Sequence, residues 1–369
     1  MHWFKKNQSS EFNVHFNDGP VVTNLNPRNS LKVHFWLHEN LEYEINLRPN
    51  EWGKCYKRYC APWRIEILND RDKVLATHKF DPSDQKILIN FDSRSLGDTL
   101  AWIPQVDRFA QQHPTARVLC CLFWPDLGFE NTYPNIEFVP PDTQLDDIYA
   151  TYAIGYFLND DLENRHPNDP RQQPLGKVAS DILNIEYEER CSRLGVQNEI
   201  RDIDDKYVCF TTESTAACKL WQYPGGWQRV IEHLNTVGLR PVLIQQKPTE
   251  MEGIVNRSGD HPIQQRISEL KHCEFFIGLG SGLSWLAWAL HKPVVLISGF
   301  SEPYTEFRNN CIRVINHDAC TGCWNDTNYV FDRDDWNWCP RHKDTDRQLE
   351  CSKSITPQMV ISAIESLTK

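Results

Sequence analysis

Ile87-Leu88-Ile89-Asn90-Phe91 is an apolar run that is typical of a buried parallel strand. It is followed by Asp92-Ser93-Arg94-Ser95-Leu96-Gly97-Asp98, and from Thr99 to Gln112 apolar residues recur at helical spacing. A strand, a turn that contains glycine and a helix start are the parts of a ligand-binding crevice in an open α/β sheet. The turn carries Asp98 to the carboxyl end of the sheet, where we expect this carboxylate to act as a catalytic base.

Asp98 also fits a plainer interpretation. A turn, an Asp and a helix often follow one another, and on this segment alone an N-cap that accepts backbone N–H bonds is the favoured role. Gly97 would let a ligand approach the backbone closely, and the free N–H groups of the helix start would attract an anion. We therefore expect Ser95, Leu96 and Gly97 to contact a substrate beside Asp98.

Composition restricts the possible functions. The chain has 369 residues, a net charge of −11 and a pI near 5.6, which argue against nucleic-acid binding because phosphate contacts need a basic surface. No run of about 18 apolar residues predicts a membrane span. Without an apparent export signal, the cysteines that lie in apolar runs (Cys120, Cys121, Cys209 and Cys273) are expected to be reduced core thiols of a cytoplasmic protein. Cys55 and Cys60 are a weak candidate for a second metal site, and simple core or surface thiols are the favoured interpretation.

Three regions are predicted. Residues 1–86 contain short alternating segments such as Leu31–Leu37, which indicate a small antiparallel β domain. Residues 87–200 and 201–369 each alternate apolar runs with helical segments, so we expect an α/β protein with two Rossmann-like domains facing each other across a cleft. The first is expected to carry the base and bind an acceptor, and the second to bind a donor nucleotide.

Two segments of the second domain could hold a diphosphate. Thr211–Trp221 leaves a predicted strand with hydroxyl groups and an ammonium group, although a solvated polar loop would have the same composition. Ile277–Trp285 runs from a strand into a helix, where glycines expose the backbone and the helix dipole favours an anion. The candidate ligands are Thr212, Ser214, Thr215, Lys219, Gly280, Ser281, Gly282, Leu283, Ser284 and Trp285.

Gln245 and Gln246 follow another predicted strand and could hold a nucleoside, although an exposed polar loop fits nearly as well. No Asp-x-Asp run is present to hold a divalent metal that bridges a nucleotide. We therefore expect no such metal, and assign the charge of a leaving group to Lys219 and to the helix N-termini.

Cysteine spacing gives the strongest local signal. Within residues 318–353, called the cysteine knuckle below, two cysteines lie three positions apart and two more follow. This spacing predicts a closed, structural four-thiolate metal site, and thiolate ligands suit either zinc or iron. Disulfides are the alternative, which a cytoplasmic location disfavours. The four predicted ligands are Cys320, Cys323, Cys339 and Cys351.

The sequence resembles the lipopolysaccharide heptosyltransferases of glycosyltransferase family 9, which have a GT-B fold. Ser95–Leu100, Ser214-Thr215 with Lys219, and Gly282-Leu283-Ser284 match that family in order and spacing. It is still more similar to the bacterial autotransporter heptosyltransferases, the TibC-like group. That similarity is carried by Gly278–Trp288, by Asp334–Lys343 and by the extra N-terminal β domain.

This resemblance implies inverting transfer of heptose from ADP-glycero-manno-heptose to serine or threonine hydroxyls of an autotransporter passenger domain. It implies that Asp98 is the base, that Lys219 binds phosphate and that Gly280–Ser284 cradle the diphosphate. It also implies one iron per subunit in the four-cysteine site and a large homo-oligomer, a dodecamer.

One departure and two alternatives accompany the resemblance. The lipopolysaccharide enzymes have Asp and His where this chain has Gly280 and Trp285, so their sugar contacts cannot be transferred to these positions. The alternative functions are a heptosyltransferase that acts on lipopolysaccharide core and a non-catalytic scaffold that binds a sugar nucleotide. The presence of both Asp98 and Lys219 argues against the scaffold.

Overall fold

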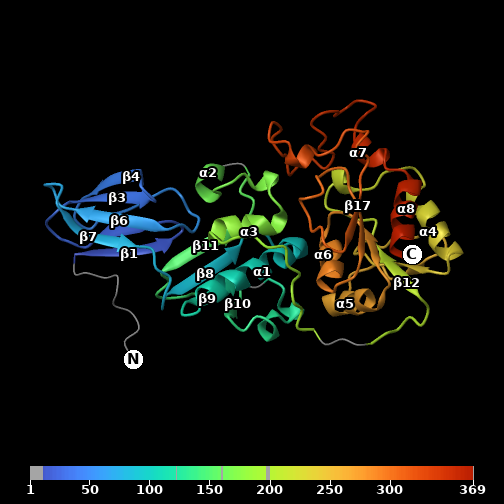
Figure 1. Cartoon of the computed structure of the whole chain (residues 1–369), viewed down its shortest axis with the longest axis horizontal. Coiled ribbons are helices and arrows are strands. Elements are labelled where there is room, and N and C mark those ends of the chain that lie inside the picture. Colours follow the sequence, from blue (N-terminus) through green and yellow to red (C-terminus); the bar gives the residue numbers. More distant parts are fainter. Residues whose placement is uncertain (1–10, 122, 159–160, 197–199, 369) are drawn as a thin grey trace.

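The computed structural model describes residues 11–121, 123–158, 161–196 and 200–368. Three sheets follow one another along the long axis of the molecule (Figure 1). A four-stranded sheet lies at one end, a seven-stranded sheet lies in the middle and a six-stranded sheet lies at the other end. Among the described residues, no helix combines the length and apolar character that crossing a membrane requires.

The seven-stranded sheet is built on the strand predicted at Ile87–Phe91. Its order is β10-β9-β8-β11-β1-β2-β5, and the first five strands run parallel to one another. The last two pair antiparallel, and together with β1 they come from the N-terminal part of the chain. The strands are β1 (Phe12–Asn17), β2 (Val21–Asn24), β5 (Trp52–Lys54), β8 (Lys86–Phe91), β9 (Arg117–Cys121), β10 (Ile136–Val139) and β11 (Ala150–Ile154).

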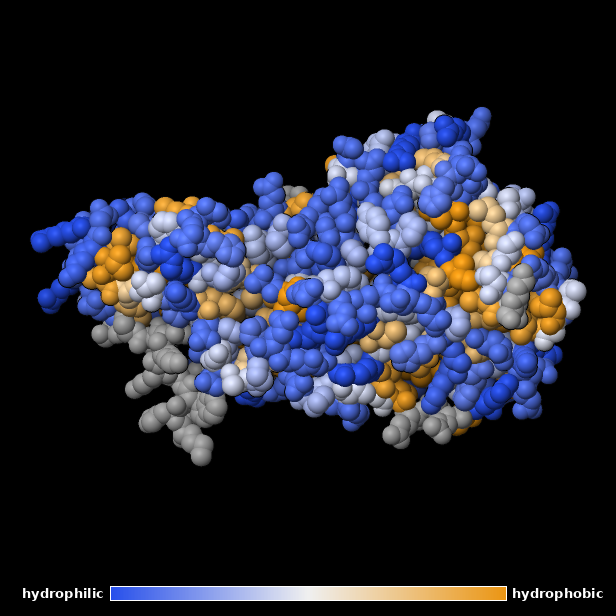
Figure 2. Space-filling view, viewed as in Figure 1, coloured by the Kyte–Doolittle hydropathy of each residue, from blue (hydrophilic) through white to orange (hydrophobic). Residues whose placement is uncertain are grey.

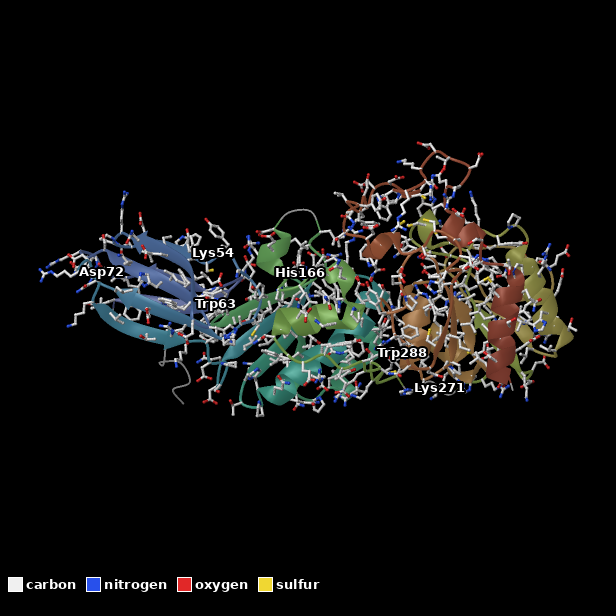
Figure 3. The ribbon with its side chains drawn as sticks, turned by 45° about the horizontal axis from the view of Figure 1, so that its top comes forward. Lys54, Trp63, Asp72, His166, Lys271 and Trp288 are labelled. Atoms are coloured by element: carbon white, nitrogen blue, oxygen red, sulfur yellow. The ribbon has the colours of Figure 1, made fainter. Side chains whose placement is uncertain are left out.

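The four-stranded sheet is antiparallel, with the order β4-β3-β6-β7. Its inner side chains, including Phe35 and the fully buried Trp63 (Figure 3), belong to the same apolar core as Val14 and Phe16 of β1. The boundary predicted at residue 86 stays a prediction, and strands from both sides of it share one sheet. The four strands are β3 (Leu31–Leu37), β4 (Asn40–Leu47), β6 (Trp63–Leu68) and β7 (Val74–Lys79).

The six-stranded sheet is entirely parallel and has the order β14-β13-β12-β15-β16-β17. This is the Rossmann order, in which a crevice opens at the carboxyl ends of the two central strands. The prediction of parallel α/β units is thus confirmed. The strands are β12 (Tyr207–Phe210), β13 (Arg240–Leu243), β14 (Val255–Asn256), β15 (Phe276–Gly278), β16 (Val294–Ile297) and β17 (Cys311–Val314).

Helices cover both parallel sheets. Helix α1 begins at Leu96, three residues before the predicted start, and it packs against α3 and α6. The indole of Trp102 donates to the Leu175 carbonyl at 3.0 Å, which fixes α1 against the start of α3. The helices are α1 (Leu96–Gln112), α2 (Leu162–Arg165), α3 (Leu175–Leu183), α4 (Gly226–Thr236), α5 (Ile263–His272), α6 (Gly282–Ala289), α7 (Glu350–Lys353) and α8 (Pro357–Thr368).

The N-termini of α1 and α6 meet where the two parallel sheets face each other (Figure 1). A Cβ at Gly282 would lie 3.0 Å from the Cβ of Leu96, and one at Gly97 would lie 3.1 Å from Cδ1 of Trp285. The two glycines therefore allow a close approach that larger residues would hinder. Two positive helix ends consequently lie beside one another.

The cysteine knuckle crosses the top of the six-stranded half in Figure 1. It has little regular structure beyond a short 3-10 turn, Cys323–Asn325, and α7. A small apolar cluster fills it, with Phe300, Trp324, Trp338 and Leu349 at its centre. After the knuckle, α8 packs on α4, and so the last helix belongs to the second half.

Buried Arg171 fastens the knuckle to the first half of the chain. Its guanidinium donates to four knuckle carbonyls at 2.5–3.1 Å. Arg171 lies on a 3-10 turn before α3, held by Asp169, whose carboxylate accepts from the Arg171 backbone N–H. One side chain thus joins the first half of the chain to the knuckle. The four acceptors are the carbonyls of Cys323, Trp324, Asp326 and Tyr329.

Candidate active site

A cavity of about 300 Å³ lies where the two parallel sheets face each other. Its wall includes the N-terminus of α1, the loop after β12, the turn before α6, the loop after β16 and part of the knuckle. Segments that are far apart in the sequence therefore share one space. Nine of the predicted site residues line it: Ser95, Gly97, Asp98, Thr215, Lys219, Gly280, Ser281, Gly282 and Trp285.

The N-cap of α1 is Ser95, so the interpretation of Asp98 as the cap is wrong. The Ser95 hydroxyl accepts from the Asp98 backbone N–H at 3.2 Å. The Ser95 N–H, which a capping box would direct to the third helical residue, instead donates to the Ser93 hydroxyl at 3.1 Å. Ser95 thus caps the helix, and the Asp98 carboxylate is not required for this role.

The environment of Asp98 suits a proton acceptor. Burial raises the pKa of its carboxyl group, because desolvation penalises the charged form. Hydrogen bonds to the hydroxyls of Ser93 and Ser95 oppose this shift, as do the positive charges of Lys219 and Arg333. Asp98 is half-buried, and its carboxylate is bonded by two hydroxyl groups and lies within electrostatic reach of two cations.

Lys219 lies on a 3-10 turn, Ala217–Lys219, that the knuckle holds on both sides. The Ala217 N–H donates to the Trp336 carbonyl at 2.9 Å, and the Gln222 N–H donates to the Ser352 hydroxyl at 2.9 Å. The predicted loop therefore exists, and the knuckle determines its position.

Two predicted hydroxyl groups lack a partner within the described part of the protein. The Oγ atoms of Ser214 and Ser281 are buried, and neither forms a hydrogen bond with any described residue. Ser281 is also the N-cap of α6 without capping it through its side chain. A buried hydroxyl costs free energy unless it is bonded, so both are suited to a ligand.

Other predicted residues have structural contacts. Ser284 is fully buried and donates to the Leu279 carbonyl at 2.6 Å. The Thr212 N–H and hydroxyl both donate to Oε1 of Gln245, whose Nε2 donates in turn to Thr249. Gln246 is exposed. A nucleoside contact from Gln245 or Gln246 stays a prediction, as do substrate contacts from these residues and from Leu96 and Leu283.

Sequence reasoning did not identify several residues of the cavity wall. Arg333 lies within the knuckle, and Tyr156 follows β11. Glu306, with Ser301, lies in the loop after β16, at the carboxyl end of a parallel strand where such crevices are expected. The position of Glu306 after a predicted parallel strand could have identified it as a residue of the crevice. Arg333 directly precedes the Asp334–Lys343 block, and no local pattern connects this arginine with the cavity.

The four knuckle cysteines lie close enough to influence one another. Burial raises the pKa of Cys323 to about 12, and the neighbouring Cys320 and Cys339 add to the shift. All thirteen cysteines are free thiols. Among the described residues, no three or more His, Cys, Asp or Glu side chains have an arrangement that could hold a metal ion. The four-thiolate site therefore stays a prediction.

Comparison with known proteins gives consistent matches. Residues 177–327 match the model of glycosyltransferase family 9 (heptosyltransferase). The chain is 38% identical to the autotransporter heptosyltransferase BAHTCr of Citrobacter rodentium, over 86% of this chain and 80% of that relative. It is 32% identical to the inactive autotransporter heptosyltransferase BimC of Burkholderia thailandensis, over 84% and 75% of the two chains.

A solved structure matches nearly the whole chain. It is dodecameric iron-containing heptosyltransferase TibC in complex with ADP-D-β-D-heptose, with a TM-score of 0.89 and 35% identity. The match covers 98% of this chain and 97% of TibC. The N-terminal sheet and the knuckle are therefore included in the shared architecture.

Proposed function

Since the chain belongs to the autotransporter heptosyltransferases of glycosyltransferase family 9, we propose that it transfers heptose from ADP-glycero-manno-heptose to serine or threonine hydroxyls of an autotransporter passenger domain. One observation carries the proposal. Asp98, Lys219 and the Gly280–Gly282 turn line the same cavity, although they come from separate parts of the chain. A base, a cation and a helix N-terminus are what transfer from a nucleoside diphosphate requires.

Asp98 is the general base of this proposal. A serine hydroxyl is a poor nucleophile unless its proton is removed as the new bond forms, and a placed carboxylate contributes roughly 10²–10⁴-fold. The acceptor oxygen bonds to the anomeric carbon, the bond to the diphosphate oxygen breaks, and the hydroxyl proton passes to Asp98. Asp98 comes from the first half and the glycine turn from the second, and we propose that the acceptor attacks opposite the leaving group, with inversion.

The leaving ADP gains negative charge, which the second half of the chain is suited to stabilise. Lys219 and Arg333 both act on the cavity electrostatically, as their effect on the pKa of Asp98 indicates. The α6 N-terminus adds free N–H groups, and the unpartnered Ser281 hydroxyl lies at its cap. We assign the diphosphate to these groups, with no metal ion bridging it.

We also propose that Cys320, Cys323, Cys339 and Cys351 hold one iron per subunit. Four cysteines within one 36-residue segment, the knuckle, suit iron or zinc. The Leu349 N–H donates to Sγ of Cys339 at 3.4 Å, and Arg341 approaches Sγ of Cys320 at 3.7 Å, which is the support that thiolates need. A bound metal would hold the knuckle together. Metal analysis with an absorption spectrum distinguishes iron from zinc.

The remaining parts of the proposal are a cytoplasmic location and a dodecamer. Free thiols throughout suit a reducing compartment. Exposed apolar side chains at the four-stranded sheet include Leu41, Val74 and Leu75, and apolar surface is visible at that end of the molecule (Figure 2). Such surface favours association between subunits. Light scattering of the purified protein measures the assembly.

The decisive experiment is intact-mass analysis of a passenger domain incubated with the protein and ADP-heptose. We expect mass increments of one heptose with the native chain and none with Asp98→Asn, which should still bind ADP. If the native chain adds no heptose to the passenger domain, the enzymatic proposal fails and the non-catalytic sugar-nucleotide-binding function is supported instead. One relative is described as inactive, so this outcome has a precedent. Transfer by Asp98→Asn at the native rate would remove Asp98 as the base.

A further inference from the structure

Asp98 is one of two carboxylates in the cavity wall, and Glu306 is the other. Glu306 lies in the loop between β16 and β17, on the side of the cavity formed by the second half. Its side chain is about 11% exposed. A carboxylate this far from solvent needs partners, and those partners determine which of its oxygen atoms faces the cavity.

Glu306 is held firmly from one side. Arg313 of β17 pairs with Oε2, and the Ser301 hydroxyl donates to both carboxylate oxygens at 3.2 and 3.3 Å. Arg313 also donates to the carbonyl and the hydroxyl of Ser301, each at 2.8 Å. The carboxylate therefore has a fixed orientation, and its charge is balanced by a cation behind it.

The other oxygen, Oε1, points toward Gly280. A Cβ added at Gly280 would lie 2.8 Å from Oε1, closer than real Cβ atoms come to such an atom. The backbone at Gly280 is outside the left-handed region, so its conformation does not require glycine. Position 280 therefore needs glycine because a larger side chain would collide with the Glu306 carboxylate.

Glu306 also lines the same cavity as Asp98, the proposed base, and Tyr156. Burial raises the pKa of Tyr156, and the charges of Asp98 and then Glu306 raise it further, so the phenol lies within electrostatic reach of both carboxylates. Glu306 is thus on the same part of the wall as the base. A carboxylate there, with its charge balanced by Arg313, can accept hydrogen bonds from hydroxyl groups.

We propose that Oε1 of Glu306 accepts hydrogen bonds from hydroxyl groups of the donor sugar, and that Gly280 lacks a side chain so that this oxygen can reach the sugar. The inference rests on the proposed function, which makes the donor an ADP-sugar. Glu306 is then a specificity-determining residue. It distinguishes a sugar nucleotide from the ADP that remains after transfer.

The test is calorimetry of the full chain with two ligands, ADP and ADP-heptose. We expect Glu306→Gln to bind ADP with unchanged affinity and ADP-heptose about tenfold more weakly, as loss of a hydrogen bond to a charged group predicts. Glu302→Gln is the matched control, since it makes the same change in the same loop at a residue outside the cavity wall. It should leave both affinities unchanged.

Gly280→Ala provides a second variant that keeps the carboxylate. Its methyl group should displace Oε1 and weaken ADP-heptose more than ADP. Equal weakening of both ligands by Glu306→Gln would identify a structural role and overturn the inference, and unchanged ADP-heptose affinity would overturn it as well. If the native chain binds ADP but not ADP-heptose, the proposed function fails and the inference fails with it.

Discussion

The pKa of Asp98 is set by burial on one side and by hydrogen bonds and nearby positive charges on the other. Burial raises its pKa, while two hydroxyl groups and the cations Lys219 and Arg333 lower it. A general base works only when it is unprotonated, so these neighbours determine the pH at which activity begins. The balance can be changed one residue at a time.

Replacing Arg333 should move the acidic limb of the pH–rate profile. Because Arg333→Gln removes a positive charge that lowers the pKa of Asp98, the pKa rises and the acidic limb of kcat/KM shifts to higher pH. Arg347→Gln is the control, an exposed knuckle arginine that pairs with Glu350. Identical acidic limbs for native and Arg333→Gln enzyme would show that Arg333 does not act on the base.

Asp98→Asn should raise the melting temperature at neutral pH. Burial raises the pKa of the Asp98 carboxyl group in the folded state above its value in the unfolded state. The native state therefore loses stability as the pH rises through the folded-state pKa, because the buried carboxylate must then carry a charge. At neutral pH this charge is destabilising. Asparagine keeps the shape without the charge. Calorimetry at pH 7 and at low pH measures the effect, with exposed Asp70→Asn as control. If Asp98→Asn raised the melting temperature equally at low pH, where the native carboxyl group is protonated, the buried charge would not be the cause.

At the scale of elements, the knuckle does more than enclose cysteines. It holds the turn that carries Lys219, it supplies Arg333 to the cavity, and it receives the buried guanidinium of Arg171 from the first half. The segment that carries the four cysteines therefore also supports two of the proposed donor-binding groups, Lys219 through its turn and Arg333 directly. Loosening that segment should affect ligand binding without altering either parallel sheet.

Arg171→Ala should reduce stability by roughly 3 kcal/mol, because it leaves several carbonyls without a donor. Arg171→Lys should recover only part of the loss, since an ammonium cannot reproduce the planar fork. Denaturant unfolding measures the change, with the exposed Arg28→Ala as control. Native-like stability of Arg171→Ala would mean that water replaces the guanidinium at no cost.

The elements were predictable where patterns are local. The apolar run at Ile87–Phe91 predicted a parallel strand, and the glycine turn within Ile277–Trp285 predicted a helix start. Pairing between distant segments was not predictable, because nothing in β1 specifies β11 as its neighbour. The same difference between local patterns and long-range packing explains which residues of the cavity wall were predicted. Asp98 and Lys219 follow strands at the crevice, whereas Arg333 reaches it only through the packing of an irregular segment.

At the scale of the whole molecule, the N-terminal strands and the first Rossmann-like region share one sheet. Strand β1 covers the edge of β11, where the Phe16 N–H donates to the Tyr149 carbonyl at 2.6 Å. An uncovered edge strand is a template for aggregation. The four-stranded sheet also shares its core with β1.

A chain that lacks residues 1–84 should therefore be insoluble or aggregated. Its β11 edge and the apolar side chains that face β1 would be exposed. Size-exclusion chromatography of the refolded fragment, beside the full chain, measures this. A monodisperse fragment that binds ADP would instead support an independent N-terminal domain with a boundary near residue 86.

The pairing of β1 with β11 also has a consequence for synthesis on the ribosome. Strand β1 is complete at Asn17, but its parallel partner ends at Ile154. At about 5–20 residues per second, roughly ten seconds pass between the two. During that interval the nascent chain carries a strand whose final neighbour has not been translated. The central sheet can therefore close only after the turn that carries Asp98 has left the exit tunnel.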